Sequence, residues 1–247
     1  MKSQEITTKS VIVPNGELAI ASYLAFPEAS GSFPAIIVIQ EIFGVNHHIR
    51  DITRRFAQQG YVAIAPAIYQ RQAPGFEAGY SEDDIKIGRV YKNQTKATEL
   101  LNDIQATVDF LNGLPQVDQS GIGCIGFCFG GHVAYLAATL SEIKATASFY
   151  GAGIVNWSPG GGEPTLTRSK EIKGTLYAFF GLQDRSIPPT EVDSIEAELQ
   201  NYGIAHRIFR YPQATHGFFC DQRSSYDRQA AEDAWNHVLE LFCTALN

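Results

Sequence analysis

Five apolar residues in a row, Ala35–Ile39, follow Pro34 and precede a loop that contains Gly44. A continuous apolar run bounded in this way is typical of a strand that is buried on both faces. Such strands belong to parallel sheets that helices cover. This run therefore predicts a parallel sheet at the centre of the fold.

In the rest of the chain, strand patterns alternate with helical patterns, as expected for a parallel sheet that helices cover. We expect further strands at Tyr61–Ala65, Gly121–Gly126, Ala145–Tyr150, Thr175–Phe180 and His206–Tyr211, and helices near His48–Gln59, Thr95–Leu111, Gly130–Leu140, Thr190–Tyr202 and Asp227–Thr244. This alternation predicts an α/β fold with a doubly wound, mostly parallel sheet and helices on both of its faces.

The N-terminal segment predicts an antiparallel addition to this sheet. Two β-rich stretches, Ile6–Val13 and Glu17–Phe26, flank Asn15-Gly16, a pair that favours positive φ and a tight hairpin. We expect one domain over residues 1–247, because composition shows no shift large enough for a second one. The irregular stretches Gln70–Ser81 and Gly151–Lys173 are expected to be loops over a site at the carboxyl ends of the strands.

Charge and cysteine usage exclude several classes of protein. The net charge is −7 and no run of basic residues occurs, so we expect no nucleic-acid partner. No apolar stretch of about 18 residues occurs, so we expect no membrane span and no export. The four cysteines are scattered and show no metal-binding spacing, which favours a reducing, cytoplasmic setting without a bound metal.

The segment Gly126-Phe-Cys-Phe-Gly130 places Cys128 between a predicted strand and a predicted helix. This is the context of the nucleophile elbow G-x-S-x-G, with cysteine in place of serine. A helix N-terminus favours a thiolate, and the backbone N–H of Phe129 is placed to bind an oxyanion. The alternative is a structural cysteine in a glycine-rich turn, which is common among free cysteines.

Two later loops offer the partners that such a nucleophile needs. Asp184 follows the predicted strand Thr175–Phe180, and His216 follows His206–Tyr211, which gives the order nucleophile, acid, histidine. Singly, Asp184 could be a turn carboxylate and His216 a surface histidine, but three coincident placements favour a catalytic triad.

The other histidines fit the role of general base less well. His206 lies inside a predicted strand and His237 in the last helix, while His132 would point away from the elbow. His47 and His48 open a helix, where we expect them to cap it or to face solvent.

Glu41 follows the central apolar run in the loop that would supply a second oxyanion N–H, from Ile42. A carboxylate there could face the elbow and accept the proton of the thiol. A solvent-facing loop glutamate is an equal alternative on the residues alone.

Five segments together resemble the dienelactone hydrolase (carboxymethylenebutenolidase) family. They are Val38-Ile-Gln-Glu-Ile-Phe-Gly-Val-Asn46, Pro66-Ala-Ile-Tyr-Gln-Arg-Gln-Ala-Pro-Gly75, Gly126-Phe-Cys-Phe-Gly-Gly131, Gly181-Leu-Gln-Asp184 and Thr215-His-Gly-Phe218. The resemblance runs over nearly the whole chain and implies the α/β-hydrolase fold.

This resemblance implies that a cyclic enol ester is hydrolysed without a cofactor. Cys128 would attack the lactone carbonyl, and His216, oriented by Asp184, would act as acid and base. In the family the glutamate that Glu41 matches contacts the resting thiol and helps to deprotonate it, which settles the role of Glu41 in favour of function.

The family also uses two arginines to bind the carboxylate of dienelactone, and the chain departs from both. The position four residues after the histidine is Cys220, with Arg223 three residues further on. In the helix after the Arg-Gln-Ala-Pro-Gly stretch the matched position is Lys86 or Ile87, with Arg89 nearby and Tyr91 at a site tyrosine. We therefore expect Arg89 or Arg223 to bind an anionic substrate, with Tyr91 beside it.

The sequence thus predicts a monomeric Cys-His-Asp hydrolase of small, anionic esters or lactones, working through a thioester. A general carboxylesterase or thioesterase is the alternative within enzymes. A ligand-binding protein that keeps the fold without the activity is the alternative outside them.

Overall fold

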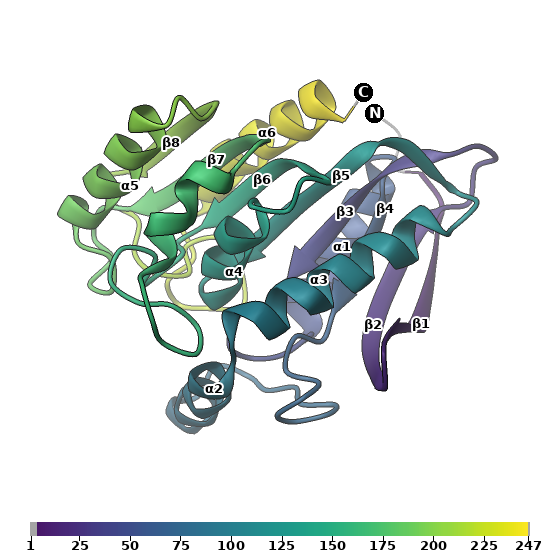
Figure 1. Ribbon diagram of the computed structural model, residues 1–247, viewed down its shortest axis with the longest axis horizontal. Helices are drawn as coiled ribbons and strands as arrows, with labels where there is room; N and C mark the ends of the chain where they lie inside the picture. Colours follow the sequence, from purple (N-terminus) through teal and green to yellow (C-terminus); the bar gives the residue numbers. More distant parts are fainter. Residues whose placement is uncertain (1–3, 247) are drawn as a thin grey trace.

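The computed structural model describes residues 4–246, and within them the strands form one eight-stranded sheet (Figure 1). Its order is β1-β2-β4-β3-β5-β6-β7-β8. The strands are β1 (Ile6–Asn15), β2 (Leu18–Pro27), β3 (Phe33–Ile39), β4 (Val62–Pro66), β5 (Val117–Phe127), β6 (Ile143–Phe149), β7 (Thr175–Gly181) and β8 (His206–Tyr211). The pairs β1/β2 and β2/β4 are antiparallel and the others are parallel, which confirms the mostly parallel sheet.

Helices cover both faces of this sheet, with α3 and α4 on the near face in Figure 1 and α1 and α6 on the far face. The helices are α1 (His47–Gln58), α2 (Glu82–Gln94), α3 (Ala97–Asn112), α4 (Phe129–Ala137), α5 (Pro189–Asn201) and α6 (Arg228–Ala245). Among residues 4–246, no helix is both long and apolar enough to span a membrane.

The apolar run in β3 is buried on both sides, as its composition predicts. Ile36 and Val38 pack into the core cluster that contains α1 and α6, whereas Ile37 and Ile39 pack into the cluster that contains α3. Successive side chains of a strand point to opposite faces, so an uninterrupted apolar run fits only a strand covered twice.

The N-terminal hairpin forms, but its turn lies one residue later than the Asn-Gly pair suggests. Asn15 remains in β1 opposite Leu18, and the two turn residues are Gly16, with φ +60°, and Glu17. The Asn15 amide donates a hydrogen bond of 2.6 Å to Asp103 on α3. This tertiary contact accounts for the extended position of Asn15.

Two helical segments lie outside the helices expected from the βα alternation. The acidic residues Glu82–Asp84 begin α2, a helix separate from α3, and Ser81 and Asp84 cap its start reciprocally. The helix ends at the buried Thr95, whose hydroxyl donates 2.7 Å to the carbonyl of Lys92. The loop over residues 151–173 includes a 3₁₀ helix, η1 (Thr165–Glu171).

Candidate active site

Cys128 lies at the sharp turn from β5 into α4. Its backbone has φ 55° and ψ −118°, an unusual conformation for a residue with a side chain, and its N–H donates 3.0 Å to the carbonyl of Phe149. The turn is tight because a Cβ at Gly126 would collide with the carbonyl of Gly130, and a Cβ at Gly130 with that of Gln40. Glycines at both positions therefore let the backbone hold Cys128 in a strained conformation above the sheet.

The structure brings Cys128, His216 and Asp184 into one line of hydrogen-bonded groups. Nε2 of His216 lies 3.1 Å from Sγ of Cys128, and Nδ1 lies 2.6 Å from Oδ2 of Asp184. Asp184 follows β7 and His216 follows β8, at the carboxyl ends of adjacent parallel strands. A nucleophile, a base and a carboxylate that orients the base are the parts of a catalytic triad.

Asp184 is itself held in place. Its carboxylate is buried, and Oδ1 accepts a hydrogen bond of 2.7 Å from the backbone N–H of Ser186. The other oxygen is therefore directed at Nδ1 of His216, which assigns the proton to Nδ1 and leaves Nε2 facing the sulfur when the ring is neutral.

Electrostatics at this site favour a protonated imidazole on His216. Burial opposes protonation of His216, but the charge of Cys128 and the hydrogen bonds to Asp184 and Cys128 outweigh it and raise the pKa of His216 above its ordinary value. The two groups are thus coupled, as in thiolate–imidazolium pairs.

Glu41, in the loop after β3, is buried and does not face solvent. Its Oε1 accepts a hydrogen bond of 3.2 Å from Nη1 of Arg223, and among the described residues its Oε2 has no hydrogen-bond partner. Burial raises the pKa of Glu41, while the charges of Arg223 and His216 oppose that shift. The expected contact of the carboxylate with the resting thiol is replaced by the ion pair with Arg223, and the thiol bonds to His216.

A cavity of about 210 Å³ opens above the sulfur. Cys128 and His216 line it, and so do Ile42 and Phe129, whose backbone N–H groups were expected to bind an oxyanion. The structure therefore places both oxyanion candidates at the same cavity as the nucleophile.

The chain as a whole is similar to known proteins. The model of the dienelactone hydrolase family matches residues 20–246. The chain belongs to the dienelactone hydrolase family. Membership makes it a hydrolase, as the resemblance of its motifs implies.

Individual relatives agree over nearly the whole chain. A Synechocystis sp. protein with the provisional name carboxymethylenebutenolidase is 58% identical over 242 residues, 98% of each chain. A Yersinia pestis protein with the same provisional name is 33% identical, over 93% of this chain and 85% of that one. A crystal structure from Klebsiella pneumoniae, provisionally described as a dienelactone hydrolase, is 30% identical with a TM-score of 0.87, covering 97% and 99% of the two chains.

Three cations line the cavity of this hydrolase: Arg89 and Arg223, which the sequence suggests, and Lys92, which it does not. Lys92 lies three residues after Arg89 on α2, so both can face the cavity from one side of the helix. Its Nζ lies 4.3 Å from the centre of the Trp157 ring, and burial lowers its pKa while the charge of Cys128 opposes that shift. Helical spacing from Arg89 was the signal that could have identified it.

Other candidates from the resemblance lie elsewhere. Tyr91 packs against Phe76, with ring centres 4.8 Å apart, and does not line the cavity. Lys86 is exposed and pairs with Asp83 at 2.8 Å. The residues of α2 that face the site therefore differ from those expected. Helical periodicity decides which side chains of α2 point to the site, and the distance in sequence from the Arg-Gln-Ala-Pro-Gly stretch does not.

Two histidines lie in environments that the sequence did not predict. His48 is buried and neither caps α1 nor faces solvent, because Asn46 is the cap and accepts 3.3 Å from the N–H of Ile49. His132 is also buried, with Nδ1 2.9 Å from the carbonyl of Ala152 and Nε2 2.7 Å from the hydroxyl of Thr165.

Proposed function

We propose that this hydrolase opens small lactones or enol esters of the dienelactone type, with Cys128 as nucleophile, His216 as acid and base, and Asp184 as the orienting carboxylate. The observation that carries the proposal is the pair of contacts at 3.1 Å and 2.6 Å that link the three side chains at the floor of a cavity. The backbone of Cys128 supports it, because strained residues concentrate at functional sites.

Acylation follows from this arrangement. The sulfur of Cys128 attacks the carbonyl carbon, and the carbonyl π pair moves onto oxygen, where the N–H groups of Ile42 and Phe129 stabilise the charge. Collapse of the tetrahedral intermediate breaks the ester C–O bond. The leaving oxygen takes the proton from Nε2 of His216, which leaves a thioester and a neutral imidazole.

Deacylation reverses these roles. Neutral His216 removes a proton from a water molecule as its oxygen attacks the thioester carbonyl. The C–S bond then breaks, the sulfur leaves as a thiolate, and the product is a carboxylic acid that loses its proton to solvent. Asp184 keeps the imidazole in one orientation throughout and stabilises its charged form.

Arg223 and Glu41 are proposed to couple substrate binding to activation of the thiol. Arg223 lines the cavity and also pairs with Glu41, so an incoming carboxylate competes with Glu41 for the guanidinium. A buried carboxylate that loses its cation binds a proton more tightly, so Glu41 can accept the proton of Cys128 where that proton has not passed to His216.

The substrate class follows from the charge of the cavity wall. Arg89, Lys92 and Arg223 present three cations at a cavity of about 210 Å³, which suits a small ester or lactone that carries a carboxylate. Neutral esters would lose these contacts.

Replacement of Cys128 tests the proposal. We expect Cys128→Ala to abolish turnover of dienelactone and of p-nitrophenyl acetate while the variant binds substrate and unfolds at the wild-type temperature. Stopped-flow absorbance with the wild-type enzyme should show a burst that corresponds to the thioester. A Cys128→Ala variant with wild-type kcat would overturn the proposal.

A screen of matched substrates separates the proposal from its alternatives. Preference for the carboxylate-bearing member of each ester pair supports the proposed substrate class, and equal turnover of neutral esters or thioesters indicates a general esterase or thioesterase. If iodoacetamide modifies Cys128 no faster than Cys243 and no substrate is turned over, the protein binds ligands without catalysis.

A further inference from the structure

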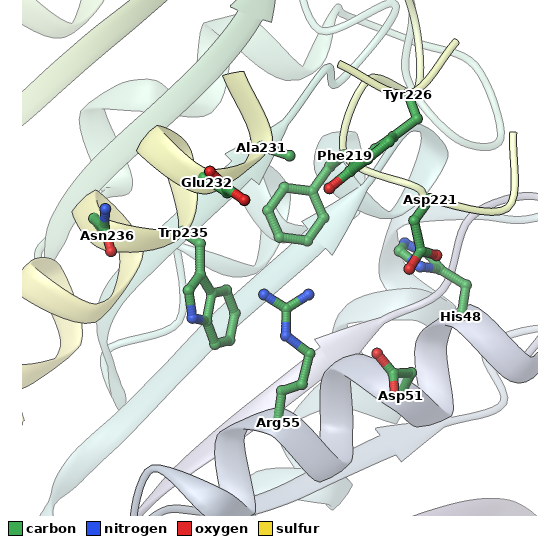
Figure 2. Close-up of a pocket in the computed structure, with 10 residues that line it drawn as sticks. All are labelled: His48, Asp51, Arg55, Phe219, Asp221, Tyr226, Ala231, Glu232, Trp235 and Asn236. Atoms are coloured by element: carbon green, nitrogen blue, oxygen red, sulfur yellow. The ribbon is translucent and has the colours of Figure 1, made fainter. Parts of the chain in front are cut away.

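A second cavity, of about 310 Å³, lies between α1, α6 and the loop that follows His216 (Figure 2). His48, Asp51 and Arg55 line it from α1, and Asp221 lines it from the loop. Figure 2 shows the ring of His48 beside the carboxylate of Asp221. None of these residues lines the cavity above Cys128, so the proposed hydrolysis does not account for them.

His48 is the residue that distinguishes this cavity. Its side chain is buried against Phe127 and Phe219, with ring centres 5.6 Å and 6.4 Å away, and among the described residues its Nε2 has no hydrogen-bond partner. Buried polar atoms are rarely left unsatisfied, so such an atom calls for an explanation. Burial and the charges of Arg55, Arg223 and His47 lower the pKa of His48 to about 3, which keeps the ring neutral and able to act as a ligand.

Cys220 and Asp221 complete a set of three possible ligand groups. One imidazole nitrogen of His48, the sulfur of Cys220 and a carboxylate oxygen of Asp221 all lie within 4.8 Å of one another. Cys220 is buried, while the side chain of Asp221 is exposed at the mouth of the cavity. We propose that His48, Cys220 and Asp221 form a binding site for a divalent transition-metal ion of the Zn²⁺ class.

Geometry and chemistry both suit such an ion. Zn²⁺ is bound by sulfur at about 2.3 Å and by nitrogen or oxygen at about 2.0 to 2.2 Å, so neighbouring ligand atoms lie about 3.5 Å apart. The three atoms lie within 4.8 Å of one another, so they need to close by up to about 1.3 Å, and the exposed Asp221 can approach the other two by rotating. Three protein ligands leave the fourth tetrahedral position to water, and thiolate with imidazole favours Zn²⁺ over Mg²⁺ or Ca²⁺.

The charges around the cavity can accommodate a dication. The lining carboxylates are those of Asp51, Asp221 and Glu232, and the lining guanidinium is that of Arg55. Asp51 pairs with Arg54 at 3.2 Å and Glu232 with Arg228 at 2.7 Å, which leaves Asp221, among the described lining residues, as the carboxylate outside these ion pairs. Arg55 stacks 4.1 Å from the centre of the Trp235 ring, and Arg223 is paired with Glu41. The thiolate of Cys220 and the carboxylate of Asp221 together balance the charge of the ion.

Binding requires the thiol of Cys220 to lose its proton. Burial raises the pKa of Cys220 to about 11, so the ion must displace this proton into solvent, and affinity falls as pH falls. The thiol now donates 3.2 Å to the hydroxyl of Tyr80. After deprotonation this hydroxyl can turn and donate to the thiolate, as partners of metal ligands commonly do.

An ion at this site would join α1 to the loop that carries His216 and Arg223. Cys220 lies four residues after His216 in the chain, and His48 lies in the first turn of α1. The ion would therefore restrain the position of the catalytic base from outside the substrate cavity, and it would stabilise the folded chain by its binding free energy.

The experiment uses Co²⁺ as a probe, in the full chain with Cys128→Ser so that the Cys128–His216 pair cannot contribute a thiolate. We expect one equivalent of Co²⁺ to bind with a thiolate-to-cobalt charge-transfer band, Zn²⁺ to displace it, and the unfolding temperature to rise. Cys220→Ser and His48→Gln should each remove the band. Cys243→Ser, a change to a thiol on α6, is the matched control and should retain it.

Asp221→Asn keeps the test decisive if the buried variants fail to fold, because its side chain is exposed. Loss of this ligand should weaken Co²⁺ binding by about tenfold or more. Failure of the Cys128→Ser protein to bind Co²⁺, a band that survives Cys220→Ser, or unchanged affinity in Asp221→Asn would each overturn the site. None of these outcomes depends on the proposed hydrolysis, since the binding assay is done without Cys128.

Discussion

At the scale of single residues, the chemistry of this protein depends on charges held where water is scarce. Glu41 and Asp184 are both buried carboxylates, but Glu41 is paired with Arg223 whereas Asp184 orients His216. Their different partners give them different proposed roles. Substrate would release Glu41 from Arg223, whereas Asp184 would stay bonded to His216. Lys92 adds a third cation to the wall of the substrate cavity, and its contribution can be measured separately.

Lys92→Met is expected to reduce discrimination between charged and neutral substrates. One charge-assisted contact contributes about 1.5 to 3 kcal/mol, so the ratio of kcat/KM for a carboxylate-bearing ester to that for p-nitrophenyl acetate should fall by about tenfold to a hundredfold. Lys86→Met removes the same charge from the exposed face of α2 and serves as the control. Equal ratios in the two variants would show that Lys92 does not contact the substrate.

At the scale of elements, the junction of β5 and α4 is the part on which the site depends most. Cys128 can occupy its strained turn only because α4 begins close to the end of β3, where Gly130 lies against the backbone carbonyls of Ile39 and Gln40. The same junction directs the first N–H groups of α4 toward the cavity, where partial positive charge favours anions. The packing at this junction therefore determines both the turn at Cys128 and the direction of the N–H groups beside it.

Gly130→Ala should lower both the stability of the fold and the activity of the site. The added Cβ would collide with backbone that cannot move without shifting β3, so we expect the free energy of unfolding to fall by about 3 kcal/mol and kcat to fall with it. Gly113→Ala, at the end of α3, meets only ordinary contacts and should change stability by less than about 1 kcal/mol. Urea unfolding and steady-state kinetics on both variants measure this difference. Equal losses would show that the elbow is not tightly packed.

At the scale of the whole molecule, the doubly wound sheet gathers the site. The elbow, Asp184 and His216 follow β5, β7 and β8, and Glu41 follows β3, so parallel pairing brings all four loops to one edge. The single domain, the monomeric state and the cytoplasmic setting stay predictions. Folding also buries His132, whose pKa falls to about 4 because burial and, to a lesser extent, the charge of Lys92 disfavour its protonated form.

Burial of His132 predicts a loss of stability in acid. In the unfolded chain the imidazole of His132 has a pKa near 6.5, so below that pH the unfolded chain binds more protons than the folded chain. Stability therefore falls as pH falls from about 6.5 towards 4. Between pH 7.5 and pH 5 the loss due to His132 should be about 2 kcal/mol.

Comparison of variants isolates this contribution. His132→Gln should lower stability at pH 7.5 yet flatten the dependence on pH by that amount, as measured by urea unfolding at both pH values. The exposed His47→Gln serves as the control for replacement of a histidine at the surface. A His132→Gln variant with the wild-type slope would contradict the prediction.

Local sequence patterns were enough to predict the fold class and the order of the candidate triad. The apolar run in β3, the βα alternation and the glycines around Cys128 are local patterns, and local patterns fix strands, helices and tight turns. They also placed Asp184 and His216 at strand ends, where parallel pairing leaves few arrangements. The family resemblance then supplied the class of reaction, and the comparisons confirmed it.

Which side chains face each other depends on how the elements pack. Arg223 pairs with Glu41, Lys92 rather than Tyr91 reaches the cavity, and His48 is buried beside Cys220 and Asp221. Each of these pairings joins segments far apart in the chain, or depends on the rotation of a helix about its axis. Contacts between distant segments are not encoded in residue spacing, because burial and contact distance are properties of the packed elements. Helical spacing indicated only that Lys92 shares one side of α2 with Arg89, and the packing of α2 decided that this side faces the cavity.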